Sequence, residues 1–206
     1  MWHQMECSVL SETETDPNIS FDKDTFHLYP CIVPLRILLL RRNDSSAWRV
    51  IDTFMDHNDQ RESKDNQAWK LHELLVRSFV QKYLNLSFSD EDIKRAIGIV
   101  RTNSVRLEQP KVGREGVAIF PTYSYANHRC QCNTFTRKIG DRLELVAQAP
   151  IGRGEEVSTR YTTPQIGSYQ RIMDIQKTWH FVCQCPRCVD PTEFGDLLKQ
   201  NVSSFD

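Results

Sequence analysis

The chain has 206 residues, 26 of them lysine or arginine and 27 aspartate or glutamate, and its formal net charge is -1. This length fits one domain, or a modest domain with appendages, that buries a hydrophobic core. The near-zero charge gives no support to nucleic-acid binding. The apolar run at 37–40 is far shorter than the roughly 20 residues that span a bilayer. We therefore expect neither a nucleic acid nor a membrane as a partner.

Polarity and apolar spacing predict a mostly helical first half. The polar, acidic stretch at 8–24 predicts a linker or flexible arm, and 56–67, which lacks apolar residues, predicts a loop. Pro34 is expected in the first turn of a helix, and Ser45 or Ser46 is expected to cap the next helix. The predicted helices are 34–40, 45–55, 68–84 and 89–100.

The second half of the chain changes to strand patterns. A buried strand is predicted at 116–120, a hairpin at 134–147 with Gly140 in its turn, and a further strand at 157–161. Apolar spacing then predicts a helix at 168–179. Together these patterns predict an α+β fold in which a helical region precedes a smaller β core.

The cysteines carry the strongest local signal. Seven are present, and Cys183, Cys185 and Cys188 form a C-x-C-x-x-C motif. The N-terminal sequence lacks the pattern of a secretion signal, so this clustering indicates metal ligation rather than disulfides. Three thiolates at this spacing wrap the backbone around one zinc ion, which needs a fourth ligand. On spacing alone, the candidates for that ligand are Cys130, Cys132 and His180.

Two further motifs are ambiguous when each is taken alone. Residues 127–133 read N-H-x-C-x-x-N, and residues 154–161 read G-E-E-V-x-x-x-Y. A single histidine such as His128 is more simply a satisfied core residue, and a tyrosine that ends a strand, such as Tyr161, usually only packs. The order of these motifs ahead of the cysteines makes the combination specific.

This order resembles the C-terminal half of a SET domain with its post-SET zinc loop. More narrowly, it resembles the SET and MYND domain (SMYD) family in its arthropod-type branch, to which the sequence R-C-V-D-P-T-E-F-G at 187–195 is similar. His3 and Cys7 resemble the last two ligands of a MYND zinc finger. The family's N-terminal SET strands and glycine-rich donor loop find no match. We therefore expect an N-terminally truncated chain with an incomplete donor pocket.

The resemblance implies an S-adenosylmethionine-dependent protein-lysine methyltransferase with one structural zinc ion. It implies a histone or non-histone protein as substrate. We expect a monomer, and the free thiols together with the lack of a secretion-signal pattern favour a cytoplasmic and nuclear location. The divisions it implies are 1–24 as a MYND remnant and flexible linker, 25–107 as a helical SET insertion, 108–165 as the C-terminal SET core and 166–206 as the post-SET zinc region.

The resemblance also implies roles for single residues. Tyr161 matches the tyrosine that orients the reacting groups and is the catalytic candidate. The donor S-adenosylmethionine is expected to contact Asn127, His128 and Phe181, with Asn103 as a weaker candidate. By motif position, Cys130 rather than Cys132 completes the zinc site with Cys183, Cys185 and Cys188.

Two departures from the family pattern bear on function. Arg129 stands where the family has serine, and this cation disfavours a sulfonium donor unless its side chain points to solvent. Cys132 stands where the family has proline.

A catalytically inactive or truncated relative that acts as a zinc-stabilised interaction module is the alternative interpretation. A metal-binding domain unrelated to methylation is disfavoured by Tyr161 together with the Asn127–His128 pair.

Overall fold

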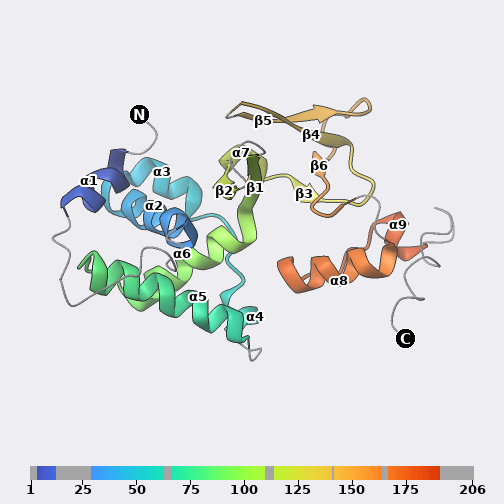
Figure 1. Cartoon of the computed structure of the whole chain (residues 1–206). Helices are drawn as coiled ribbons and strands as arrows, with labels where there is room; N and C mark the ends of the chain where they lie inside the picture. Colours follow the sequence, from blue (N-terminus) through green and yellow to red (C-terminus); the bar gives the residue numbers. More distant parts are fainter. Residues whose placement is uncertain are drawn as a thin grey trace. The chain divides into compact units, whose positions relative to one another are not determined.

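The computed structural model describes residues 4–12, 29–62, 66–109, 114–140, 142–163 and 167–190. The chain divides into two compact units, Met1–Ile119 and Phe120–Asp206, which are described separately (Figure 1). Helices and strands are both present, as the α+β prediction requires. No helix in the described ranges is long and apolar enough to cross a membrane. The MYND-like His3 and the sequence after Asp190 lie outside the described residues.

The N-terminal unit is a group of helices followed by an antiparallel two-stranded ribbon. Its elements are α1 (Gln4–Glu12), α2 (Tyr29–Asn43), α3 (Ser45–Ile51), α4 (Asn58–Glu62), α5 (Gln67–Arg77), the π-helix η1 (Ser78–Tyr83), α6 (Asp90–Asn103), β1 (Ser104–Gln109) and β2 (Arg114–Ile119). Helices α2 and α6 supply much of its core, including Leu35, Leu38, Ile93 and Ile97, which are all at most 1% exposed. The predicted helices at 68–84 and 89–100 are therefore confirmed as α5 with η1 and as α6.

Local capping chemistry explains two of the helix starts. Ser89 Oγ accepts a hydrogen bond from the backbone N–H of Asp92 at 3.1 Å, so Ser89 is the N-cap of α6. At α3 the cap is Asp44, whose Oδ1 accepts from the N–H groups of Ser46 and Ala47 at 3.1 and 3.0 Å. The prediction that Ser45 or Ser46 caps this helix was one or two residues late.

Two further predictions for the first half of the chain, on Pro34 and on residues 8–12, were wrong in detail. Helix α2 begins at Tyr29, so Pro34 lies inside it rather than in its first turn. Proline has no backbone N–H and removes one hydrogen bond from the helix, and the burial of the apolar residues on both sides of Pro34 outweighs that loss. Residues 8–12 belong to α1, not to a linker, because α1 is held to α2 by an ion pair between the buried Glu6 and Arg36.

Helix α4 forms inside the segment that was predicted to be a loop. Its buried residue is Arg61, which is 5% exposed, lies over the ring of Trp69 and donates to Thr102 Oγ1 at 3.1 Å. Hydrophobic periodicity cannot reveal this helix, because a cation and not an apolar side chain fills its buried position.

The C-terminal unit has short elements that are joined by long connections. They are α7 (Pro121–Ser124), β3 (Asn127–His128), β4 (Thr134–Ile139), β5 (Arg142–Ala147), β6 (Ser158–Thr159), α8 (Ser168–Trp179) and α9 (Pro186–Val189). The predicted hairpin is confirmed: β4 and β5 pair antiparallel, and Gly140 takes φ +59 in the turn. The helix predicted at 168–179 is confirmed as α8.

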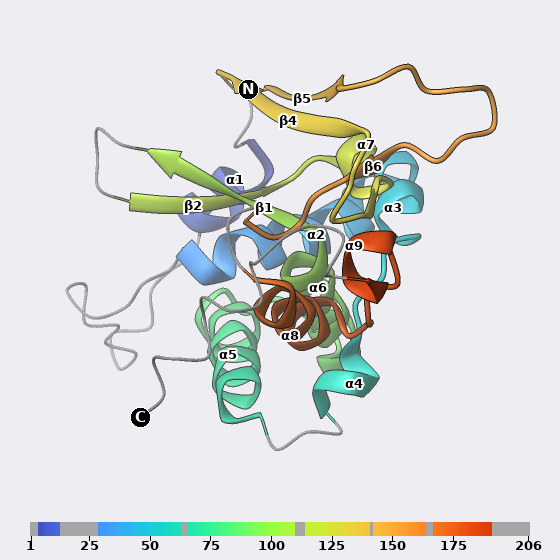
Figure 2. The same ribbon diagram turned by 90° about the vertical axis from the view of Figure 1, so that its right-hand side faces the viewer.

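The pairing of β3 with β6 positions the candidate site. The two strands are parallel, with Asn127 opposite Ser158 and His128 opposite Thr159. The loop after β5 returns the chain to β6 beside β3 (Figure 2). The strand predicted at 157–161 is therefore present but shorter. This pairing brings the N-H-x-C-x-x-N motif next to the segment that ends in Tyr161.

We predict that Gly98→Ala destabilises the N-terminal unit. A Cβ at Gly98 would collide with Asn58 Oδ1 and would lie 2.7 Å from Asp56 Cβ and 2.9 Å from the Asp56 carbonyl oxygen. Overpacking costs about 1–3 kcal/mol, more than the ~1 kcal/mol that alanine gains over glycine inside a helix. Urea unfolding should show a net loss of free energy of unfolding.

Gly116→Ala is the matched control for this measurement. Its Cβ would meet Leu107 Cβ at 3.9 Å, an ordinary contact, so stability should stay within about 0.5 kcal/mol of the wild type. A Gly98→Ala protein as stable as the wild type would contradict the close packing of α6 against the turn at Asp56.

Candidate functional site

Four cysteine thiols converge in the C-terminal unit. The Sγ atoms of Cys130, Cys183, Cys185 and Cys188 all lie within 4.8 Å of one another. Cys130 is fully buried, and Cys183 and Cys185 are 6% and 7% exposed. Ile175 and Trp179 of α8 pack against these cysteines. The cluster thus joins the turn after β3 to α9 and to the connection between α8 and α9.

The local backbone explains how three cysteines reach one point. Helix α8 ends at Trp179, and the next residue, His180, takes a left-handed conformation with φ 59 that turns the chain away from the helix axis. Pro186 opens α9, for which proline at the first helical position is well suited. The N–H of Cys188 then donates to the carbonyl of Cys185 at 2.8 Å, which folds this segment around its own thiols.

The donor set and its spacing fit a zinc ion. A tetrahedron of zinc–sulfur bonds of ~2.3 Å separates the sulfurs by about 3.8 Å, and Cys130 Sγ lies 3.4 Å from Cys188 Sγ. Burial raises the pKa of the Cys183 and Cys188 thiols. Burial also acts to raise the pKa of Cys185, but hydrogen bonds from the Cys130 N–H and the Cys183 thiol lower it to about 7.

The other two candidates for the fourth ligand lie outside this cluster, among the residues that the structure describes. Cys132 is half-buried, and its Sγ accepts a hydrogen bond from Gln148 Nε2 at 3.7 Å. His180 forms the left-handed turn at the end of α8. Spacing alone left Cys130, Cys132 and His180 open, and the structure brings only Cys130 to the three clustered thiols.

His128 links the cysteine cluster to Tyr161. Its Nδ1 accepts a hydrogen bond from the Tyr161 backbone N–H at 3.0 Å, and its Nε2 faces Cys130 Sγ at 3.2 Å. Burial first, then the charges of Arg160 and Arg171, lower the pKa of His128 to about 4. The ring is therefore neutral at pH 7. Because Nδ1 accepts, the ring proton is on Nε2 and points at the sulfur.

Tyr161 is fixed at both ends. Its backbone N–H is held by His128, and its hydroxyl donates to the carbonyl of Ala126 at 2.9 Å. Its ring lies 5.3 Å from the ring of His128 and 4.9 Å from that of Trp179. Burial, then the charges of Tyr123 and Glu156, raise the pKa of Tyr161 to about 12. The side chain is therefore a neutral hydroxyl with its oxygen lone pairs available near pH 7.

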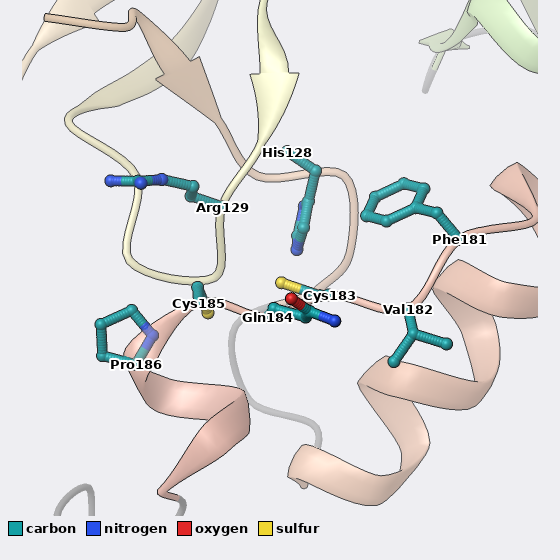
Figure 3. Close-up of a pocket in the computed structure, with 8 residues that line it drawn as sticks. All are labelled: His128, Arg129, Phe181, Val182, Cys183, Gln184, Cys185 and Pro186. Carbon is teal, nitrogen blue, oxygen red and sulfur yellow. The ribbon is translucent and has the colours of Figure 1, made fainter.

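A pocket of about 330 Å³ adjoins the cluster and is lined by His128, Arg129 and residues 181–186 (Figure 3). The ring of Phe181 faces His128 across it, with the ring centres 6.2 Å apart. Figure 3 shows the exposed Arg129 side chain extending away from His128 and Phe181. Arg129, the cation that was expected to disfavour a sulfonium donor unless it pointed to solvent, therefore does not point at the rings of His128 and Phe181.

The predicted donor-site asparagines lie in different units. Asn127 is in β3, and its Nδ2 donates to Glu156 Oε1 at 2.7 Å. Asn103 ends α6 in the N-terminal unit, where its Nδ2 donates to the carbonyls of Met55 and Ile99, each at 2.9 Å. The structure thus gathers Asn127, His128 and Phe181 in one unit and uses Asn103 within the other.

Asn133 is a residue whose importance sequence reasoning missed. Its Oδ1 accepts from the Ser158 N–H at 2.9 Å, and its Nδ2 donates to the Glu156 carbonyl at 2.9 Å and to Glu155 Oε1 at 3.2 Å. It thereby ties the G-E-E-V turn to the start of β4. The available signals were the asparagine at the last position of N-H-x-C-x-x-N and, in the G-E-E-V motif, a pair of glutamates with no assigned role.

Comparisons with known proteins show which proteins this chain is similar to. No protein-family model matches the chain. The chain is 32% identical over 111 residues to SET domain-containing protein SmydA-8, isoform A, of Drosophila melanogaster, covering 52% of the chain and 24% of that protein. It is 22% identical over 201 residues to N-lysine methyltransferase SMYD2-B of Danio rerio, and the match covers 97% of the chain and 45% of that protein. Histone-lysine N-methyltransferase SET5 of Candida albicans is 35% identical to the chain over 86 residues, and the match covers 40% of the chain and 17% of that protein.

These relatives confirm the resemblance to SMYD-family SET-domain proteins, which extends over nearly the whole chain. The Drosophila relative fits the arthropod-type branch that the sequence indicated. The chain spans less than half the length of the relatives that it matches.

We predict that the purified, reduced chain holds one zinc ion and that Cys130→Ser loses it. A hard hydroxyl replaces a soft thiolate in that variant, so the site keeps three protein ligands. Because metal binding is coupled to folding, the melting temperature should fall as well. Zinc content by inductively coupled plasma mass spectrometry and thermal unfolding measure the two effects.

Cys132→Ser is the matched control, since this thiol lies outside the cluster. It should keep one zinc ion and the wild-type melting temperature. Zinc loss in Cys132→Ser with retention in Cys130→Ser would overturn the ligand assignment.

Proposed function

We propose that the chain carries part of a SET-type protein-lysine methyltransferase that uses S-adenosylmethionine and contains one structural zinc ion. The observation that supports this most directly is the pairing of β3 with β6, which sets Tyr161 against His128 beside the four thiols. The relatives named above as lysine methyltransferases support the same function. On this proposal, 25–107 is the helical insertion, 108–165 the SET core, and 166–206 the post-SET region.

The zinc ion has a structural role in this proposal. Its ligands are Cys130, Cys183, Cys185 and Cys188, so protein sulfurs fill all four positions and leave none for a substrate. The metal would fasten the connection between α8 and α9 to the turn after β3. Since residues 181–186 line the pocket next to His128, this fastening builds one pocket wall.

The pocket beside His128 is the proposed binding place of the methyl donor. His128 and Phe181 present ring faces suited to contact with a planar base, and their rings lie 6.2 Å apart. Asn127 contributes from the adjacent position of β3, held by Glu156. Asn103 stays a weaker candidate, because its amide donates to two carbonyls of the N-terminal unit.

Bound S-adenosylmethionine would supply an electrophilic methyl group on a sulfonium ion. Transfer to a lysine requires a neutral amine that is aligned with the methyl–sulfur bond, so positioning contributes more than acid–base strength. Tyr161 suits this task, because its hydroxyl oxygen is fixed by Ala126 and can accept polarised C–H groups. With its pKa raised to about 12, the Tyr161 hydroxyl is not a general base near pH 7.

The proposed partner is a protein that presents a lysine side chain, from a histone or another protein. The chain is proposed to act as a monomer in the cytoplasm and nucleus. The lysine-bearing partner rests on what the relatives' names say of those proteins, and the location rests on the free thiols of this chain.

We predict that Tyr161→Phe abolishes methyl transfer and leaves zinc bound. The substitution removes one hydroxyl that does not belong to the metal cluster, so the ring can still pack on Trp179. Incorporation of tritium from labelled S-adenosylmethionine into core histones measures transfer, and zinc analysis checks the site. Cys132→Ser is the control, which should keep the wild-type rate of methyl transfer and the wild-type zinc content.

Two results would contradict the proposal. Wild-type turnover by Tyr161→Phe would remove Tyr161 from the reaction. A zinc-loaded wild-type chain that binds the donor and transfers no label, to histones or to itself, would favour the inactive interaction module.

A further inference from the structure

The outer edge of strand β6 is closed by side chains instead of a backbone strand. On the inner side, where β6 pairs with β3, the Thr159 carbonyl accepts from the Arg129 N–H at 3.0 Å. The N–H and the carbonyl of Ser158 point to the other side, where an open strand edge would leave them unpaired. Ser158 is 1% exposed, so bulk water cannot reach these two groups and the protein has to satisfy them.

The Asn133 carboxamide takes the place of a peptide group along this edge. Its Oδ1 accepts from the Ser158 N–H and its Nδ2 donates to the Glu156 carbonyl, both at 2.9 Å. A carbonyl and an N–H two residues apart are the pair that one residue of a neighbouring parallel strand would bind. Thr134 Oγ1, which is buried, then donates to the Ser158 carbonyl at 2.8 Å. Two consecutive side chains thus satisfy both backbone groups of Ser158.

This edge bears on Tyr161, because β6 is short and Tyr161 follows it by two residues. The strand is Ser158–Thr159, and a pairing of this length gives little stability by itself. The Tyr161 N–H and hydroxyl reach His128 Nδ1 and the Ala126 carbonyl at 3.0 and 2.9 Å. Both acceptors are in β3 or directly before it. Movement of β6 relative to β3 would therefore displace the two contacts of Tyr161 together.

We propose that Asn133 is a positioning residue, which sets the place of the Tyr161 hydroxyl by closing the outer edge of β6. The inference rests on the proposed function, in which this hydroxyl orients the reacting groups. The described residues that line the pocket beside the cysteines are His128, Arg129 and 181–186. Asn133 is not among them, so it acts on the reaction through β6 and not by contact with a ligand there.

Asn133→Ala removes both edge bonds and should lower kcat for methyl transfer. A reacting group that is misplaced by about 1 Å can cost about 100-fold in rate, so we expect a loss of roughly tenfold to 100-fold. The KM for S-adenosylmethionine should change little, because the cysteine cluster and not β6 holds residues 181–186. Both constants are measured in the full-length chain with labelled S-adenosylmethionine and core histones.

Fluorine NMR of the full-length chain separates this role from a loss of folded protein. Tyr161 is one of six tyrosines, and 3-fluorotyrosine gives each a resonance, with Tyr161 assigned through Tyr161→Phe. In Asn133→Ala the Tyr161 resonance should shift or broaden. Tyr83, whose ring stacks on Phe79 in the N-terminal unit, should keep its resonance. A change that only destabilised the fold would add unfolded-chain signals and leave the folded Tyr161 resonance in place.

Arg137→Ala is the matched control on the same hairpin. The exposed Arg137 side chain donates to Glu144 at 3.0 and 2.7 Å, so this variant also removes two hydrogen bonds but none to β6. It should keep the wild-type kcat and the wild-type Tyr161 resonance.

Asn133→Asp is the second test variant, because it keeps the size of the side chain and loses the donor. Its carboxylate would face the Glu156 carbonyl and Glu155 Oε1, which accept from Asn133 Nδ2 in the wild type. The Tyr161 resonance should therefore move in this variant as well. Glu155→Gln added to Asn133→Asp should recover part of the loss, since the new amide can donate to the introduced carboxylate.

Two outcomes overturn the inference. The first is a wild-type Tyr161 resonance and kcat in folded Asn133→Ala, or in Asn133→Asp if the alanine variant does not fold. The second is an equal displacement of Tyr161 in Arg137→Ala, since any change in the hairpin would then have this effect. If the wild type transfers no methyl group, the proposed function fails, whereas a Tyr161 resonance that moves only in the Asn133 variants still supports the positioning role.

Discussion

The convergence of four thiols from two distant segments is the constraint on which the C-terminal unit depends. Strands β3 and β6 have two residues each, and α9 has four. Pairings this short give little stability by themselves. The cysteines fasten the turn after β3 to the connection after α8, and a metal that binds them would make that fastening part of the folding free energy.

The rest of the site follows from that attachment. Cys130 is two residues after His128, so fixing Cys130 also fixes the ring whose Nδ1 holds the Tyr161 N–H. Cys183 is two residues after Phe181, so the same attachment sets the opposite wall of the pocket. A metal bound there would therefore contribute no reacting group, yet it would help to fix where the histidine, the tyrosine and the phenylalanine stand.

Some features that depend on local chemistry were predictable from the sequence, although the cap of α3 was placed one or two residues late. The Ser89 cap of α6 and the Gly140 turn of the hairpin each involve neighbouring residues only. The roles of Arg61 and Asn133 could not be predicted, because Thr102 and Glu156 lie far along the chain from them and hydrophobic periodicity does not register polar contacts. Spacing likewise indicated three clustered cysteines but left the fourth open, because the pairing of β3 with β6 decides which thiol reaches them.

The most direct test of this account is calorimetric titration of S-adenosylmethionine into the zinc-loaded chain and into the same protein after chelation, with zinc reloading as the reversibility control. The account predicts micromolar binding, about -8 kcal/mol, to the loaded and reloaded protein and no heat with the stripped protein. Equal binding with and without zinc would contradict the view that the thiol cluster builds the pocket wall. No binding to the loaded protein would contradict the donor site itself.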